Sequence, residues 1–168
     1  MSKAAPLRSR GLVVTVTDAR GRRLAAGGLA AWLPRAAPRG VHGAVAIAIV
    51  SDRAMRRLNR EFRSIHHPTD VLSFPANPEP ARSGVGSWGR FLGDIAIARG
   101  MAGRQARRLK HAVATEYRVL ALHGLLHLLG YDHEADEGQM ARLERRLRRG
   151  AGLPAGLIAR TRRPSRAR

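Results

Sequence analysis

The sequence predicts a single α/β domain of the α+β type, in which a mixed sheet of about four strands packs with about five helices. Three observations support this prediction. Four short segments are apolar and rich in β-branched residues, and they alternate irregularly with longer segments that favour helices. The 168 residues are enough for one substantial core and contain no internal repeat. The composition, 44% hydrophobic and 26% charged, is ordinary for a globular protein.

The first strand and the first helix are expected near the N-terminus. Residues 11–20 contain an alternating apolar run, which predicts a strand. Residues 21–37 are rich in Ala and Leu and predict a helix. Gly27 and Gly28 weaken this helix, and Pro34 is expected to end it.

A second strand and helix follow. Residues 43–50 are apolar almost without interruption, which is typical of a central strand. Ser51 or Asp52 can cap the next helix, at residues 53–62. One face of that helix is expected to contain Met55, Leu58, Asn59 and Phe62.

The second half of the chain supplies the remaining elements. Residues 71–75 and 91–98 predict two more strands, separated by a Pro/Gly-rich surface loop at residues 76–89. A long helical region is expected from residue 103 to 129, with a candidate break near His111.

Gly130 is expected to end the long helical region, as a glycine at a helix C-terminus does. A last helix is expected at residues 135–149. The chain therefore divides into a flexible lead at residues 1–10, a single domain at residues 11–150, and a basic, disordered tail at residues 151–168.

The chain is strongly basic. It contains 31 Lys and Arg against 12 Asp and Glu, for a net charge of +19, and the excess is not confined to the tail. Such a charge predicts a polyanionic partner, with nucleic acid favoured over an anionic membrane surface. No cysteine is present, so any metal site must use His, Asp or Glu. No apolar run approaches the ~18 residues that span a membrane.

Three histidines lie close together in the stretch LHGLLHLLGYDHE, which begins at Leu122. His123 and His127 are four residues apart in a helical segment, so both imidazoles lie on one face, one turn apart. Gly130 then lets the chain turn, so that His133 can return as a third ligand. Three His ligands leave a fourth position for water, as in catalytic zinc sites. A lone buried histidine more often belongs to a core, but three at this spacing favour a metal.

The same H-x3-H-x5-H spacing occurs in one class of zinc peptidases. Those enzymes carry a Glu directly after the first His as general base. Gly124 occupies that position here and cannot accept a proton, which disfavours a peptidase. Asp132 can either orient a ligand imidazole or cap the following turn, and both alternatives stay open.

Three stretches are similar to sequence blocks of one family. HGLLHLLGYDH resembles the H-G-x-L-H-L-x-G-Y-D-H signature of the bacterial YbeY family, the zinc-dependent endoribonucleases of rRNA maturation. LNREFRSIHHPTDVLSFP, at residues 58–75, and LGDIAIA, at residues 92–98, resemble two further blocks of that family. The three blocks occur in the family's order and frame residues of about 50–140.

This resemblance implies a one-domain fold with one zinc ion held by His123, His127 and His133. It implies a single-strand-specific endoribonuclease that takes part in 16S rRNA 3′-end maturation and ribosome quality control. Residues 11–150 would then be the catalytic, metal-binding domain. Arg63 is expected in the cleft that faces the metal, which makes Arg63 and His123 the candidate catalytic residues. The implied partners are single-stranded rRNA and ribosomal proteins, in the cytoplasm and not at a membrane.

The chain departs from the family's pattern at two places. The family often carries a Lys two residues beyond the position of Arg63, where this chain has Ile65. One expected phosphate contact is therefore missing, and His66 or His67 can substitute for it. The loop at residues 76–89 and the Arg-rich tail match none of the family's blocks.

Three classes of function remain after this comparison of motifs. A metal-dependent endoribonuclease is favoured, and a zinc peptidase is disfavoured by Gly124. A non-catalytic, ribosome-associated RNA-binding protein with a structural zinc is disfavoured because three ligands leave an open site. Ser73 and Asp94 belong to the similar blocks, and either cleft shaping or strand packing can explain them.

Overall fold

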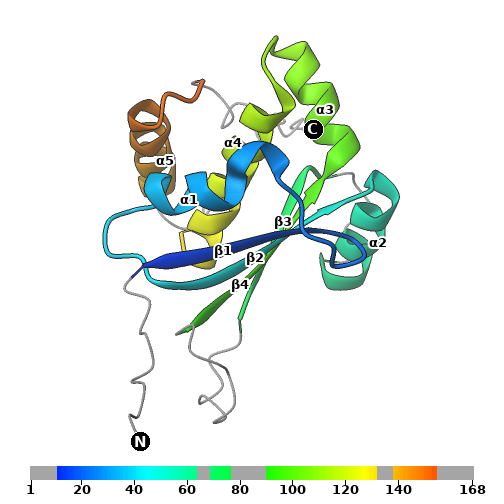
Figure 1. Ribbon diagram of the computed structural model, residues 1–168, viewed down its shortest axis with the longest axis horizontal. Helices are drawn as coiled ribbons and strands as arrows, with labels where there is room; N and C mark the ends of the chain where they lie inside the picture. The colour runs from blue at the N-terminus through cyan, green and yellow to red at the C-terminus, as the bar shows by residue number, and fades with distance from the viewer. Residues whose placement is uncertain (1–10, 64–68, 77–89, 132–137, 155–168) are drawn as a thin grey trace, which may run out of the picture.

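Strands and helices follow one another in the order that the apolar patterns predict, and they form a layered α/β arrangement (Figure 1). The computed structural model describes residues 11–63, 69–76, 90–131 and 138–154. In chain order the elements of these residues are β1 Leu12–Asp18, the 3-10 helix η1 Ala26–Gly28, α1 Leu29–Ala36, β2 Gly43–Val50, α2 Asp52–Arg63, β3 Val71–Pro75, β4 Phe91–Ala98, α3 Arg99–Arg108, α4 Val113–Leu128 and α5 Gln139–Gly150. Two parts of the predicted domain plan, the flexible lead at residues 1–10 and most of the tail, lie outside the described residues.

The four strands form one sheet in the order β1-β2-β4-β3. β2 pairs in parallel with both β1 and β4, and β3 pairs antiparallel with β4. The almost uninterrupted apolar run of β2 therefore lies in the interior of the sheet, as its sequence predicts. The predicted fold class, a mixed four-stranded sheet with five helices, is confirmed for the described residues.

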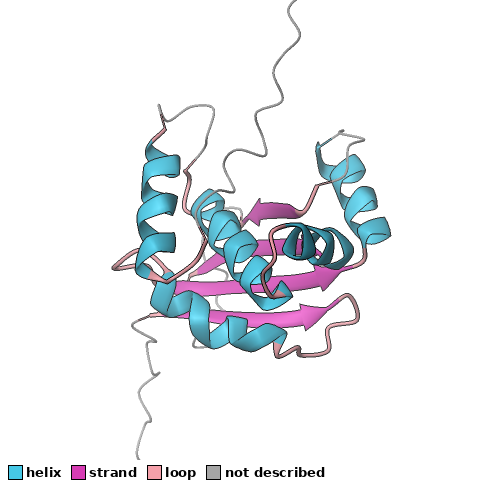
Figure 2. Cartoon of the chain, turned by 90° about the horizontal axis from the view of Figure 1, so that it is seen from above, coloured by secondary structure: helices cyan, strands magenta, loops and turns pink. Residues whose placement is uncertain are grey.

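Helices pack on both faces of the sheet. Figure 2 shows several of them lying across the strands when the chain is seen from above. Along β4, Ile95 and Ile97 belong to the larger core, which α1 and α4 close. Ala96 and Ala98 alternate with them and belong to the smaller core under α2. None of the described helices is long and apolar enough to cross a membrane.

The helix predicted at residues 21–37 has different bounds from those its composition indicates. Gly27 and Gly28 both have positive φ angles, 65° and 77°, so α1 starts only after them. Pro34 lies inside α1 and does not end it at once. A proline removes one N–H donor, and the N–H of Ala37 still closes the last turn on Leu33 O.

Ser51 and Asp52, the two candidate caps of α2, have different roles in the structure. Ser51 Oγ accepts a hydrogen bond from Ala54 N at 3.2 Å, so Ser51 is the capping residue. The carboxylate of Asp52 instead accepts from Met101 N at 3.1 Å and from Arg104 Nη2 at 2.7 Å. Asp52 therefore connects the start of α2 to the first turn of α3.

Two other predictions need correction. The helical region expected at residues 103–129 starts earlier and consists of α3 and α4, which are separated by a turn in which Lys110 has a φ of 56°. The break near His111 is thus confirmed. Phe62 was expected on the packed face of α2, but its relative exposure is 65%. Its ring makes an edge-to-face contact with the ring of Phe74 on β3, with 5.1 Å between the two ring centroids.

Helix α4 packs closely against β3 and β4 at Gly124. A Cβ atom at this position would lie 2.9 Å from Ile95 Cγ2 and 3.0 Å from Ser73 Oγ. Ser73 Oγ also donates a hydrogen bond to the carbonyl oxygen of Gly124 at 3.0 Å. The absence of a side chain at residue 124 therefore sets the distance between α4 and the sheet.

Replacement of Gly124 by alanine tests this contact. We expect Gly124→Ala to lower the free energy of unfolding by about 1–3 kcal/mol, because the new methyl group must push α4 away from Ile95 and Ser73. Urea denaturation of the purified chain measures the change. A fully stable variant would show that the helix has room to move.

Gly103 in α3 provides the matched control. A Cβ there meets nothing nearer than an atom of Arg107 at 3.9 Å, at the far end of a flexible side chain. Gly103→Ala is therefore expected to leave stability unchanged or to raise it by up to about 1 kcal/mol through the higher helix propensity of alanine. Equal losses in both variants would contradict the account of Gly124.

Candidate metal centre

Helix α4 carries the histidine pair at the centre of the fold (Figure 1). It contacts β3, β4, α1, α3 and α5, and most of its side chains are buried. His123 and His127 are both partly exposed, and they lie one turn apart along α4. The apolar residues around them fix the helix, so the two imidazoles have a defined position.

The two imidazoles meet through their Nε2 atoms. His123 Nε2 and His127 Nε2 are 3.2 Å apart, and the rings are inclined by 72°. Two nitrogen ligands at 2.0–2.1 Å from one tetrahedral ion would be separated by about 3.3–3.4 Å. The observed separation fits two ligands of one ion, and it also fits a hydrogen bond between an N–H and a lone pair.

The turn after His127 is built as a helix-ending motif. Gly130 has a φ of 91°, and its N–H donates to His127 O at 3.0 Å. Tyr131 N donates to Leu126 O at 3.1 Å, which completes a Schellman motif. The predicted role of Gly130 as the helix stop is confirmed. His133 and Asp132 lie outside the described residues, so the third ligand and its orienting carboxylate stay predictions.

Glu144 on α5 is a partner of the pair that the sequence did not single out. It is fully buried, and its Oε2 lies 3.3 Å from His123 Nδ1. A carboxylate accepts, so His123 donates through Nδ1–H, and in the neutral ring the lone pair is then on Nε2. This is the tautomer that presents Nε2 to a metal, with a carboxylate behind the ring.

A buried arginine completes this arrangement. Arg148, one turn beyond Glu144 on α5, donates from Nη2 to Glu144 Oε1. Burial alone would raise the pKa of Glu144, but hydrogen bonds and charges from His123 and Arg148 outweigh it and hold the pKa below its ordinary value. Glu144 is therefore an anion that links α5 to His123 on α4.

A periodic signal for Glu144 is present in the sequence, although it is weak. Met140, Glu144 and Arg148 follow one another at four-residue spacing and are the buried residues of α5. The apolar residues of α5 alone would put Met140, Leu143 and Leu147 on its inner face, yet both leucines are only partly buried. A Glu and an Arg at this spacing usually form a solvated pair, and the distant partner His123 is what brings them inside.

The other candidate residues lie apart from the pair or outside the described region. Arg63 is the last residue of α2, and its side chain is not among the described ones, so its place in the cleft stays a prediction. Ser73 faces α4 and bonds Gly124, which supports a packing role. Asp94 alternates with Ile95 on β4 and so faces away from α4. Burial raises the pKa of the Asp94 carboxyl.

His111 does not join the pair. Its Nε2 lies 3.1 Å from an oxygen of the buried Glu116, at the start of α4. Within the described ranges, no group of three or more His, Asp or Glu residues is placed to hold an ion. His133, the third predicted ligand, lies outside those ranges.

Comparison with known proteins places this geometry in a family. A family model described as Endoribonuclease YbeY matches residues 29–151, well over half of the chain. The chain belongs to the YbeY family. The matched range contains the histidine pair, Gly130 and Glu144, and it extends across α1 to α5.

Individual YbeY relatives are substantially similar to the chain. Endoribonuclease YbeY of Solibacter usitatus is 51% identical over 112 residues, which cover 67% of this chain and 69% of the relative. Endoribonuclease YbeY of Koribacter versatilis is 44% identical over 126 residues, 75% of this chain and 76% of the relative. A Thermotoga maritima protein with a known solution structure superposes with a TM-score of 0.52 at 25% identity, over 83% of this chain and 88% of that one.

The buried pair on α5 leads to a stability prediction. Glu144→Gln is expected to lower the free energy of unfolding by about 3–5 kcal/mol, because it leaves Arg148 buried without its charge partner. The measurement is chemical denaturation in a chelating buffer, so that metal binding does not contribute. Glu61→Gln breaks an exposed pair with Arg57 and serves as the control, with an expected change within about 0.5 kcal/mol.

The stability difference between wild type and Glu144→Gln is expected to depend on pH. Because the folded-state pKa of Glu144 is depressed, its contribution is complete above the ordinary value of 4.5 and is lost as the pH falls through the folded pKa. The stability difference between wild type and Glu144→Gln should therefore narrow below pH 4.5. A difference that stays constant into strong acid would argue against a charged Glu144.

Proposed function

We propose that this YbeY-family chain is a zinc-dependent, single-strand-specific endoribonuclease. We further propose that it acts in the cytoplasm on rRNA, in 16S rRNA 3′-end maturation and ribosome quality control. The observation that carries the proposal is the convergence of the Nε2 atoms of His123 and His127, at 3.2 Å, in a relative of proteins named Endoribonuclease YbeY. Ribosomal proteins are the proposed partners that direct it to rRNA.

The donor chemistry of the pair suits zinc. Imidazole nitrogens bind Zn²⁺ well, and a chain without cysteine offers no thiolate to compete with them. In the proposed site His123, His127 and His133 hold one zinc ion per chain, and Glu144 holds His123 in the tautomer that presents Nε2. Zinc bound there supplies a Lewis acid for a phosphoryl oxygen and lowers the pKa of a bound water toward ~7.

Arg63 has a separate role in the proposal. Phosphodiester cleavage adds negative charge to the phosphate, and a guanidinium can donate hydrogen bonds to two of the phosphate oxygens in a bidentate contact. Arg63 ends α2, and its proposed task is to bind and orient the scissile phosphate. His123 acts through the metal, as a ligand.

The distribution of charge supports RNA as the substrate. The net charge is +19, and α2 contributes a basic surface hollow of about 320 Å³ lined by Arg53, Arg57 and Arg60. Arginines in this arrangement bind phosphate backbones without reading base sequence. The hollow is on the same helix as Arg63, so substrate phosphates can extend from the proposed cleavage site along α2.

The structure weakens the peptidase alternative further. A general-base Glu at residue 124 would need a side chain where even a Cβ lies 2.9 Å from Ile95 Cγ2. The close packing of α4 on the sheet therefore excludes that base. A structural zinc without catalysis remains the alternative that an assay must test.

The test of the function is cleavage of single-stranded rRNA with and without a chelator. The proposal expects cleavage that a chelator abolishes and that one equivalent of zinc restores. RNA binding without cleavage under both conditions would favour the non-catalytic alternative. Cleavage that survives complete removal of metal would contradict the role of zinc.

Replacement of any one of the three proposed ligands is expected to reduce the amount of bound zinc. His123→Ala, His127→Ala and His133→Ala should each reduce zinc from about one ion per chain to a small fraction of that value, because two imidazoles hold zinc weakly. Metal analysis of the purified chains measures this directly. His111→Ala, which changes a histidine paired with Glu116, is the control and should keep its zinc. Unchanged zinc in all three ligand variants would contradict the proposed site.

Arg63 predicts a loss of activity without loss of metal. Arg63→Glu should reduce single-stranded rRNA cleavage by about 100-fold or more, because it removes a charge-assisted phosphate contact and adds a repulsive charge. Zinc content and thermal stability should stay at wild-type values. Arg107→Glu makes the same change at an exposed position of α3 and should retain most of the activity. Full activity of a folded Arg63→Glu chain would leave Arg63 as an ordinary surface residue.

A further inference from the structure

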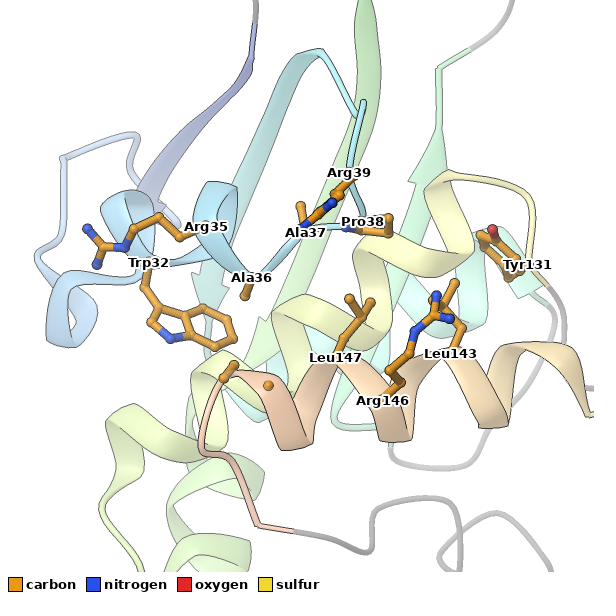
Figure 3. A pocket seen from close by; sticks show the side chains of 12 residues that line it. Trp32, Arg35, Ala36, Ala37, Pro38, Arg39, Tyr131, Leu143, Arg146 and Leu147 are labelled. Carbon is orange, nitrogen blue, oxygen red and sulfur yellow. The ribbon is translucent and has the colours of Figure 1, made fainter.

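A groove of about 740 Å³ lies between α1 and α5, and neither His123 nor His127 lines it (Figure 3). Trp32 on α1 lies at one end of it and Tyr131 at the other. Leu143 and Leu147 rise from α5 between these two aromatic side chains. The volume is within the ~300–1,000 Å³ of typical ligand sites, so a nucleotide-sized group fits.

The rim of the groove is positively charged. Arg35 and Arg39, at the end of α1 and in the turn after it, and Arg146, on α5, line it and are all exposed. None of the described residues that line the groove is acidic. An anionic ligand would therefore meet three guanidinium groups around an apolar floor.

The groove adjoins the candidate metal centre. Tyr131 follows the Gly130 stop and is four residues beyond His127 in the chain. On α5, Glu144 faces His123, whereas Leu143 and Arg146 line the groove. Helix α5 therefore contributes residues to both sites. An RNA chain bound at the candidate metal centre could continue past Tyr131 into the groove.

The combination of groups identifies the class of ligand. Aromatic side chains beside arginines are how proteins bind single-stranded nucleic acid, with bases stacked on rings and phosphates on guanidinium groups. An acidic peptide would use the arginines but not the aromatic ends. The chain's own C-terminal segment is a poor occupant because residues 155–168 contain five arginines and no acidic residue.

We propose that the α1–α5 groove binds a segment of single-stranded RNA. Its bases contact Trp32 and Tyr131, and its phosphates contact Arg39 and Arg146. The inference rests on the proposed RNA substrate and adds a second contact site, beyond the metal centre. The groove thereby favours single strands, because paired bases cannot reach its aromatic ends.

The first test is RNA binding by the full chain in a chelating buffer, where no metal-dependent turnover occurs. Anisotropy of a labelled single-stranded oligoribonucleotide of about 10 nucleotides measures the Kd. The double variant Arg39→Glu/Arg146→Glu should raise the Kd by at least about tenfold and reduce the salt dependence of binding by about two phosphate contacts. Circular dichroism checks that the variant is folded.

A matched double variant controls for net charge. Arg107→Glu/Arg108→Glu makes the same charge change on α3, at two exposed positions. It should raise the Kd by less than about threefold, because it alters only the long-range field. Equal effects of the two double variants would overturn the proposal, since net charge alone would then explain the binding.

The second test observes Trp32 directly. The chain contains two tryptophans, so the Trp88→Phe variant has Trp32 as its single tryptophan. The oligoribonucleotide should quench its fluorescence, and poly-glutamate of equal charge should not. Quenching by neither, or equally tight binding of poly-glutamate that also depends on Arg39 and Arg146, would overturn the assignment to RNA.

Failure of this site and failure of the proposed function are distinguishable. A chain that cleaves RNA, but whose groove variant binds like the α3 control, keeps its function and loses the groove. A chain that binds RNA through the groove but never cleaves with zinc keeps the groove and loses the proposed activity. The two results depend on different variants and different readouts.

Discussion

The close packing of α4 against β3 and β4 is the constraint on which the rest of the arrangement depends. Residue 124 has no side chain, and that absence lets the helix lie directly on Ile95 and Ser73. The apolar remainder of α4 is then enclosed by α1, α3 and α5, so its position is fixed from every side. His123 and His127 inherit that fixed position, because their spacing along a rigid helix leaves little freedom beyond side-chain rotation. Gly124 thus has two consequences: it leaves the chain without the general base of a peptidase at this position, and it allows the close packing that positions the histidine pair.

Helix α5 adds a buried ion pair behind the histidine pair. Its buried Glu144 accepts from His123 Nδ1, and Arg148 balances the carboxylate inside the protein. A buried pair of this kind contributes little net stability compared with apolar packing, so its presence is better explained by what it does for His123. It selects one tautomer and directs Nε2 outward. The opposite side of α5 contributes Arg146 to the groove, so one helix connects ligand orientation with the proposed path of RNA.

Local patterns predicted most of the fold and half of the site. The strands followed from short apolar runs, and the histidine pair followed from four-residue spacing on a helix that Gly130 ends. What the sequence could not supply were relations between distant segments. Glu144 looks like a solvated helix charge until α5 packs on α4, and Trp32 and Tyr131 belong to one groove only in three dimensions. The bounds of α1 differed from prediction because the local backbone angles of Gly27 and Gly28, rather than composition, decided where it starts.

In the proposed site, one zinc ion is held by imidazoles on and beyond α4, with one coordination position open to solvent. X-ray absorption at the zinc edge of the purified, stoichiometrically loaded chain tests it most directly. The account predicts a four-coordinate shell of light ligands at about 2.0–2.1 Å, with the outer-shell scattering of three imidazoles and one oxygen ligand in the remaining position. A six-coordinate oxygen shell, or a zinc spectrum that His123→Ala and His127→Ala leave unchanged, would contradict it.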